Sequence, residues 1–299
     1  MSDEMVDEQV TTTEEISDVK EDVVSAPVEE SSADAISALK GMFSFFTILP
    51  INIDQKEMDS MNKELWLAPV VGLFYGLLAM VVFELVSNIS TYVLACALSI
   101  FSVEFVNRFL HFDGMIDVGD GLMVAGRRED HTRALKDTLV GAGGVATAAM
   151  FILIIFSELL SLNANSIAMA LVAAEVLARF AQVVTAGFGS PSNGMAGASV
   201  RNTDKTSILM AAVLTVILLA IGCVIATFVT HLDTGAFCRA SCYFGAAISM
   251  AVAFLWGYVM SKVAMKNFGF VNGDVLGATN QTTRIVVLLV MILITVNFW

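Results

Sequence analysis

Long apolar runs separated by shorter polar segments dominate the chain from residue 66 onward. Most of these runs last about 20 residues, which is the length an α-helix needs to cross the hydrocarbon core of a bilayer. The pattern predicts about seven membrane-spanning helices, at residues 66–87, 89–110, 140–161, 164–187, 207–230, 241–262 and 285–299. The preceding segment, 35–53, is amphipathic and ends near Pro50, which predicts a helix that lies in the membrane interface.

Composition supports this interpretation. The chain has 299 residues, of which 57% are hydrophobic and 15% are charged. Soluble globular proteins have about 45–50% apolar and about 25% charged residues, so a soluble enzyme is excluded. The expected fold is an all-α, polytopic integral membrane protein.

The acidic balance of the chain comes from its beginning. Residues 1–34 hold 12 of the 29 acidic residues and one base, Lys20, and they contain no aromatic residue. Such a segment cannot bury enough apolar surface to fold, so we expect a disordered acidic tail at 1–34 on the cytoplasmic side. The remainder, 35–299, is expected to form a single transmembrane catalytic domain. No basic patch suggests nucleic-acid binding.

The connections between the predicted spans alternate in length and charge. Long polar loops are expected at 111–139, 188–206 and 263–284. These loops and their margins hold most of the bases that lie near the spans: Arg127, Arg128, Arg133, Lys136, Arg201, Lys205, Lys262, Lys266 and Arg284. The short connections hold Arg239 alone. By the positive-inside rule, the N-terminus and all three long loops face the cytoplasm, in a multi-pass protein of the cell membrane.

The densest polar segment, 108–144, contains three aspartates with helical spacing. Asp113, Asp117 and Asp120 fall at i, i+4 and i+7, which places them on one face of a helix. Their mutual repulsion calls for a cation, and carboxylate oxygens suit Mg²⁺ shared with substrate phosphates. A solvated acidic loop is the alternative. Apolar residues alternate with the carboxylates, which favours the metal site.

Bases and glycines follow this cluster and recur in the later loops. Arg127, Arg128, Arg133 and Lys136 would complement a pyrophosphate, although each also fits as an ordinary positive-inside residue. The glycine-rich segments 187–199 and 268–284 could cradle phosphate through backbone N–H groups.

Two pairs of opposite charge lie within the predicted spans. Glu104 and Arg108 are four residues apart, as are Glu175 and Arg179. Ionisable residues at membrane depth mark functional sites by default, and a structural salt bridge between helices is the competing interpretation.

Several of these segments resemble one family. HFDGMIDVGDG (111–121) is similar to a pattern H-hydrophobic-D-G-L-x-D-x-x-D-G, and FTILP (46–50) is similar to F-x-x-L-P. The later segment GFVNGDVLGA (269–278) is similar to G-x-x-G-D-x-x-G-A. The pattern R-R followed by D-[ST]-x-x-G-x-x-G resembles Arg127, Arg128, Asp137, Thr138, Gly141 and Gly144. Together with Arg179, these segments resemble the cobalamin-5′-phosphate synthase (adenosylcobinamide-GDP ribazoletransferase) family over residues 40–284.

The resemblance implies a membrane-bound, Mg²⁺-dependent transferase of the final stage of cobalamin assembly. A hydroxyl of α-ribazole, or of its 5′-phosphate, would attack the cobinamide-linked phosphorus of adenosylcobinamide-GDP and release GMP. Asp113, Asp117 and Asp120 would hold one or two Mg²⁺ ions, and Arg127 and Arg128 would assist the departing GMP. His111 is a general-base candidate, with a metal-facing carboxylate as its rival. The expected substrate-binding residues are Arg108, Lys136, Asp137, Gly141, Gly144, Arg179, Asn272 and Asp274.

Two other classes of protein remain as alternatives. A CDP-alcohol phosphotransferase or a polyprenyl transferase needs a second aspartate pair, whereas this chain offers single acids, Asp137 and Asp274. A transporter would place polar residues near the middle of the membrane and would show inverted repeats. The sequence leaves open whether the protein forms a homo-oligomer.

Overall fold

A computed structural model describes residues 34–229 and 236–297 of the chain, and every described element is helical apart from one isolated β-bridge. Apart from Asp34, the predicted tail lies outside the described residues. The elements are α1 (Ala35–Phe46), α2 (Gln55–Lys63), a 3₁₀ turn η1 (Leu65–Leu67), α3 (Ala68–Ile89), α4 (Tyr92–Val106), α5 (Leu110–Met123), α6 (Arg128–Leu135), α7 (Ala142–Ser161), α8 (Ala164–Phe188), α9 (Met195–Asn202), α10 (Lys205–Val229), α11 (Ala236–Asn267) and α12 (Gly273–Asn297).

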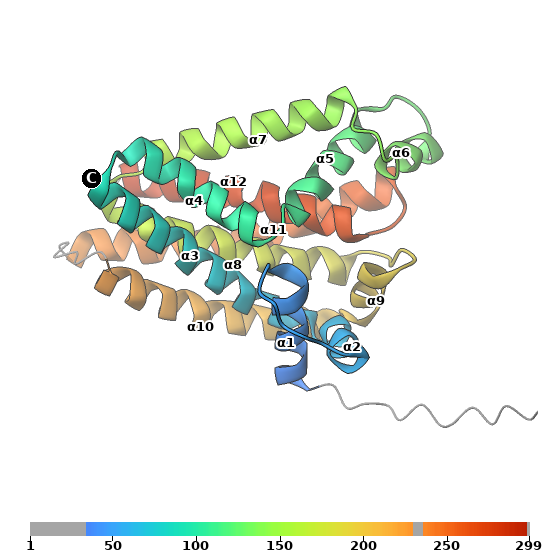
Figure 1. The fold of residues 1–299 in the computed structure, drawn as a ribbon, viewed down its shortest axis with the longest axis horizontal. Coiled ribbons are helices and arrows are strands. Elements are labelled where there is room, and N and C mark those ends of the chain that lie inside the picture. The colour runs from blue at the N-terminus through green and yellow to red at the C-terminus, as the bar shows by residue number, and fades with distance from the viewer. Residues whose placement is uncertain (1–33, 230–235, 298–299) are drawn as a thin grey trace, which may run out of the picture. The chain divides into compact units, whose positions relative to one another are not determined.

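The long helices form a bundle around α8 (Figure 1). Helices α3, α10, α11 and α12 all pack against α8, and the apolar part of α8 is completely buried. Small residues allow this close packing, as is common between helices in membranes. A Cβ atom at Gly76 of α3 would lie 2.7 Å from Val172 Cα of α8. The buried helix α8 therefore forms the centre of the molecule.

Six described helices are long and apolar enough to cross a membrane, and a bent pair, α4 with α5, supplies a seventh span if it is counted as one. The predicted all-α, polytopic membrane fold is thus confirmed. The bend between α4 and α5 is 91°, and it occurs where Arg108 and Phe109 adopt left-handed backbone angles with φ of 59° and 57°. These angles are unusual for residues other than glycine. The bend separates the aspartate-bearing helix from the span before it.

Two predicted boundaries need correction. The prediction places a polar loop at 263–284 and the last span at 285–299, but α11 continues to Asn267 and α12 begins at Gly273. The Asn272 side chain accepts a hydrogen bond from Val275 N at 3.1 Å and so starts α12 early. The predicted loops at 111–139 and 188–206 also contain helices, namely α5, α6 and α9.

Helix α1 lies across the direction of the long helices, near the end of the bundle where α2 and α9 also lie (Figure 1). It ends before Pro50, as the sequence suggests, and Lys40 on α1 forms an ion pair of 3.0 Å with Glu57 on α2. Arg108 donates hydrogen bonds to the carbonyl oxygens of Ser44 at 3.0 Å and Phe45 at 2.7 Å. Cations are favourable at helix C-termini, so Arg108 fixes the end of α1 to the bend between α4 and α5.

Candidate active site

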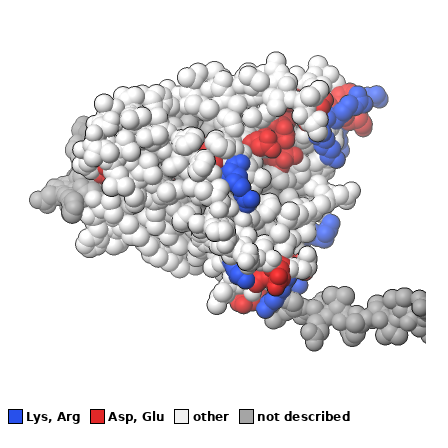
Figure 2. Space-filling view, in the orientation of Figure 1, with Lys and Arg blue, Asp and Glu red and all other residues white. Residues whose placement is uncertain are grey.

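Polar side chains gather at one end of the bundle. Figure 2 shows most acidic and basic atoms at the end where α2, α5 and α6 lie, whereas most of the remaining visible surface carries no charge. The predicted helix through the aspartate segment is confirmed as α5. On this helix Asp113 is exposed, and Asp117 and Asp120 are half-buried. The candidate functional residues are therefore expected at this charged end of the molecule.

Helix α5 crosses the start of α12 at very close range. A Cβ atom at Gly114 would lie 2.7 Å from Asp274 Cα, and one at Gly277 would lie 3.1 Å from His111 Cα. The crossing brings Asp274 near Asp113 and Asp117, and the charges of these three carboxylates act on one another. Asp274 also accepts a hydrogen bond of 2.6 Å from Asn272. The structure thus adds a fourth acid from a distant part of the chain to the predicted aspartates.

Asp120 has a different environment from Asp113 and Asp117. Its carboxylate oxygens accept hydrogen bonds from Gly141 N at 2.7 Å and from Gly144 N at 2.8 Å, at the beginning of α7. A Cβ atom at Gly144 would lie 2.6 Å from an Asp120 oxygen, so the glycine leaves room for this contact. A carboxylate at a helix N-terminus is favourable because it satisfies free N–H groups and the helix dipole. Asp120 therefore joins α5 to α7.

A basic groove lies between α6 and the connection from α11 to α12. It has a volume of about 360 Å³, and its walls include Arg128, Arg133, Lys136, Phe268 and Phe270. The Lys136 ammonium lies 5.2 Å from the centre of the Phe270 ring, and its charge also attracts Asp274. A groove with cations and aromatic rings suits a nucleotide, since it offers both charge complementarity and stacking.

The neighbouring predicted residues hold this groove in place. The Arg128 guanidinium donates to the Met265 carbonyl at 3.2 Å and lies against Gly269, whose φ is +85°. Arg127 is the exposed residue before α6. Asp137 is also exposed, and its side chain accepts a hydrogen bond of 3.0 Å from Leu139 N. Arg127 and Asp137 are therefore open to solvent at the edge of the groove.

A second pocket, which is more apolar, lies beside Asp113 and Asp274. Its volume is about 170 Å³, and α1, α2, η1, α5, α8, α9 and α12 all contribute to its walls. Asp113 and Asp274 line this pocket together with His111. Two of the acids at the crossing of α5 and α12 thus line the apolar pocket, and one of them, Asp274, also interacts with the charge of Lys136 in the basic groove. We call this arrangement the candidate active site.

His111 and Arg179 lie behind this site rather than on the surface. The His111 ring stacks on Phe46 with 5.8 Å between ring centres, and the Arg179 guanidinium lies 4.4 Å from the centre of the same Phe46 ring. Arg179 is completely buried and donates to Gln182 at 3.3 Å. His111 has access to the apolar pocket, whereas Arg179 is not exposed to a substrate in this structure.

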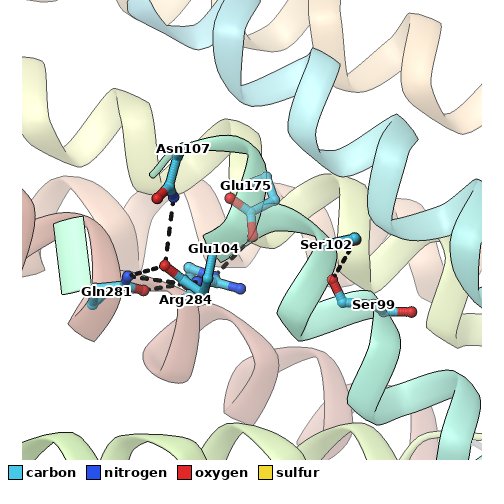
Figure 3. Close-up of polar contacts among 7 residues, drawn as sticks. All are labelled: Ser99, Ser102, Glu104, Asn107, Glu175, Gln281 and Arg284. Carbon is cyan, nitrogen blue, oxygen red and sulfur yellow. Dashed lines mark hydrogen bonds and ion pairs between the residues drawn. The ribbon is translucent and has the colours of Figure 1, made fainter. Parts of the chain in front are cut away.

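The two predicted pairs of opposite charge are not formed within their helices. Instead, Arg284 of α12 forms ion pairs with both Glu104 of α4 and Glu175 of α8, the latter at 2.8 Å (Figure 3). Gln281 donates to both Glu104 oxygens at 2.9 and 3.0 Å, and Asn107 completes the cluster. Arg284, counted above as a loop base, is thus a buried structural residue. The polar run from Thr279 to Arg284 was the sequence feature that indicated this buried polar cluster.

The carboxylates fit a magnesium ion that is shared with a substrate. In the described part of the chain, no cation forms an ion pair with Asp113, Asp117 or Asp274. Among the same residues, no three His, Cys, Asp or Glu side chains converge closely enough to hold an ion alone. Mg²⁺ is usually held by one or two carboxylates together with substrate phosphates. The observed donor set is compatible with that mode of binding.

Comparison with known proteins identifies the family of this chain. The family model described as cobalamin-5-phosphate synthase matches residues 38–292. A relative from Methanocella arvoryzae named adenosylcobinamide-GDP ribazoletransferase is 28% identical over 263 residues, which cover 87% of this chain and 97% of the relative. Relatives with the same name from Methanosarcina mazei and Bradyrhizobium diazoefficiens are 29% and 27% identical, covering 85% and 88% of this chain and 91% and 96% of the relatives. No solved structure gives a significant match.

Proposed function

Because the chain belongs to the cobalamin-5-phosphate synthase family, we propose that it is an adenosylcobinamide-GDP ribazoletransferase. A hydroxyl oxygen of α-ribazole, or of its 5′-phosphate, attacks the phosphorus that is linked to cobinamide. The bond from this phosphorus to the bridging oxygen of the pyrophosphate breaks, and GMP leaves with that oxygen. The products are adenosylcobalamin, or its 5′-phosphate, and GMP.

The observation that carries this proposal is that the acids line an apolar pocket and also interact with the charge of a basic groove. Asp113 and Asp274 line the apolar pocket, while the charge of Lys136 in the basic groove acts on Asp274. A transfer between two substrates needs two neighbouring sites that meet at the reacting atoms. One site suits an apolar group and the other suits a nucleotide, as the two proposed substrates require.

We assign Asp113 to the activation of the attacking hydroxyl group. It is exposed and lines the apolar pocket, so its carboxylate can contact a hydroxyl group at the pocket mouth. The Asp113 carboxylate would accept the hydroxyl proton as the new bond to phosphorus forms. His111 lines the same pocket but is almost completely buried, which makes it the weaker candidate for this role.

Asp117 and Asp274 are the residues we assign to Mg²⁺, with the pyrophosphate oxygens of the substrate as further ligands. A Mg²⁺ ion bound there would stabilise the negative charge of the phosphate oxygens in the transition state. Asp120, whose oxygens bind the backbone of α7, would keep α5 and α7 together instead. This assignment needs two protein carboxylates, in agreement with the geometry of the acids.

The basic residues would hold the leaving group. Phosphoryl transfer depends mainly on positioning and on stabilisation of charge. Arg128 and Lys136 line the groove, and Arg127 lies exposed at its edge. These residues would bind the GMP phosphate as negative charge accumulates on the breaking bond. By the positive-inside rule, the same bases support a site on the cytoplasmic side of the cell membrane.

The test is transfer by the purified protein. The protein in detergent is given adenosylcobinamide-GDP together with α-ribazole or α-ribazole 5′-phosphate, and released GMP and the corrinoid product are measured. We expect GMP release that requires both substrates and Mg²⁺, and the two ribazole substrates compared side by side identify the preferred one. A CDP-alcohol substrate serves as the control for the alternative enzyme class. CMP release from it, without GMP release, would overturn the proposal.

A further inference from the structure

Two polar residues in the walls of the apolar pocket make their hydrogen bonds within the protein. Gln182 donates to the Leu276 carbonyl at 2.9 Å and accepts from Arg179 at 3.3 Å. The Ser199 hydroxyl donates to Asn62 Oδ1 at 2.8 Å. Among the described residues that line the pocket, His111 Nδ1 has no hydrogen-bond partner and Asp113 has no ion pair. A polar group of the ligand placed against Gln182 or Ser199 would lose its water without replacement.

The buried residues around these groups are hydrophobic. Met61, Leu65 and Leu276 are buried and line the pocket, and the Phe46 ring forms part of the wall. Such a surface favours an apolar aromatic ring. Guanine carries a carbonyl, ring nitrogens and an exocyclic amine, which need hydrogen-bond partners when buried. A benzimidazole ring carries far fewer polar atoms. The apolar part of the walls, formed by Phe46, Met61, Leu65 and Leu276, therefore suits benzimidazole better than guanine.

The two sites also differ in charge. The part of the pocket wall formed by Phe46, Met61 and Leu276 carries no charge, whereas the basic groove offers the cations of Arg128, Arg133 and Lys136, which suit phosphates. This difference in charge would keep the two substrates apart.

We infer that the apolar pocket binds the benzimidazole ring of the attacking nucleoside and directs its ribose toward Asp113. This inference rests on the proposed function for the identity of the nucleoside. With the ring among Phe46, Met61 and Leu276, the sugar lies toward Asp113, which lines the pocket and is exposed to solvent. The pocket then determines which base is transferred, while the acids determine where the hydroxyl meets the phosphorus.

Ala196 of α9 offers a direct probe of this pocket. It lines the pocket, is half-buried, and faces the start of α12, where a Cβ atom at Gly273 would lie 3.7 Å from Ala196 Cβ. Ala198 is half-buried on the same helix but does not line the pocket, so it is a matched control. The variants Ala196→Cys and Ala198→Cys change one atom each and should fold.

The first experiment measures the rate at which a thiol reagent labels these two variants in detergent, with the unsubstituted protein as background. At ten times its dissociation constant, α-ribazole should slow labelling of Ala196→Cys about tenfold and leave Ala198→Cys unchanged. GMP should have no effect at either position. Protection of Ala196→Cys by GMP and not by α-ribazole, or no protection by either, would overturn the inference.

The second experiment separates this inference from the proposed function. Ala196→Leu should raise KM for α-ribazole about tenfold with KM for adenosylcobinamide-GDP unchanged, because the added methyl groups occupy space the ring needs. Ala198→Leu should change neither constant. If the wild-type protein transfers ribazole but Ala196→Leu raises KM only for adenosylcobinamide-GDP, the pocket assignment fails and the function stands. If α-ribazole protects Ala196→Cys and no GMP is released, the function fails.

Discussion

Glu104 on α4 and Arg284 on α12, 180 residues apart in the chain, form a buried ion pair inside the helical bundle. Arg284 also pairs with Glu175 on α8, so one guanidinium connects three helices (Figure 3). Each of the three side chains is almost completely buried. Buried charges are tolerated only when they are paired, because an isolated ion loses its hydration. The cluster therefore fixes the position of α12, which carries Asp274 in its first turn.

Removal of the Arg284 charge should destabilise the protein strongly. In Arg284→Met two carboxylates remain buried without a cation, and the expected loss is about 3–5 kcal/mol, as for other broken buried pairs. Thermal unfolding in detergent measures this loss. Arg108→Met is the control, since Arg108 is exposed and its hydrogen bonds to two carbonyl groups should contribute only about 1–3 kcal/mol. Equal losses in both variants would contradict a special role of the buried cluster.

Asp117 and Asp274 should act as a pair in binding Mg²⁺. Asp117→Asn and Asp274→Asn each remove one ligand charge and keep the side-chain volume. Turnover should fall by a factor of about 10² or more, and the Mg²⁺ concentration for half-maximal rate should rise. Residues that share one ion are not additive, so the double variant should lose little more than either single variant.

The control for this prediction is Asp130→Asn, on the exposed side of α6. Asp130 forms a surface ion pair of 3.9 Å with Arg133 and accepts a hydrogen bond from Arg127 N. The Asp130→Asn substitution should leave the Mg²⁺ dependence of turnover unchanged. The two-carboxylate assignment is wrong if Asp117→Asn and Asp274→Asn also keep the Mg²⁺ dependence of the parent protein.

Asp120 should behave differently from the other two aspartates. Asp120→Asn leaves one side-chain oxygen where two backbone N–H groups need acceptors, and it removes a charge from the start of α7. The expected cost is about 1–2 kcal/mol of stability. The Mg²⁺ concentration for half-maximal rate should stay close to that of the parent. A large rise in that concentration, without loss of stability, would make Asp120 a metal ligand, as its spacing in the sequence first suggested.

Much of this fold was readable from the sequence, because its main signals are local. The apolar runs predicted the spans, and the spacing of Asp113, Asp117 and Asp120 predicted the helix α5. Pairing between distant helices is not a local signal. Arg284 follows a polar run that resembles a loop, and only the packing of α12 against α4 and α8 shows that its partners are Glu104 and Glu175. The same reason explains the mistaken start of the last helix.

In the functional site, too, the sequence predicts local features but not contacts between distant segments. Sequence spacing identified the acids of α5, whereas Asp274 was expected to bind substrate because its segment resembles the family pattern. Its contact with α5 depends on Gly114 and Gly277, which allow the two backbones to approach closely. Arg108 and Arg179 were expected to bind substrate, yet one holds the end of α1 and the other is buried beside Phe46. The position of a charged residue near the membrane surface in the sequence does not reveal which residue it contacts in the folded protein.

The close crossing of α5 and α12 should be sensitive to a single added methyl group. In Gly114→Ala the new Cβ would lie 2.7 Å from Asp274 Cα. The nearest atoms all belong to the backbone of Asp274, so the two helices must separate. Because a shift of about 1 Å at a reacting centre can cost a factor of about 10², we expect such a loss in turnover. Gly245→Ala on α11 is the control, since its Cβ would meet the flexible Met291 side chain. Comparable turnover of Gly114→Ala and the parent would show that the crossing does not position the site.

The orientation of the charged end can be tested with cysteines at exposed positions. Glu129 in α6 and Asn193 before α9 lie at the end of the bundle that carries the acids, whereas Ser90, between α3 and α4, lies at the opposite end (Figure 1). Since the bases cluster at the first end, the positive-inside rule predicts that this end faces the cytoplasm. An impermeant thiol reagent added to intact cells should label Ser90→Cys only, and inverted vesicles should give the reverse result. Labelling of Glu129→Cys in intact cells would place the site outside, away from a cytoplasmic supply of nucleotide substrate, and would contradict the proposed orientation.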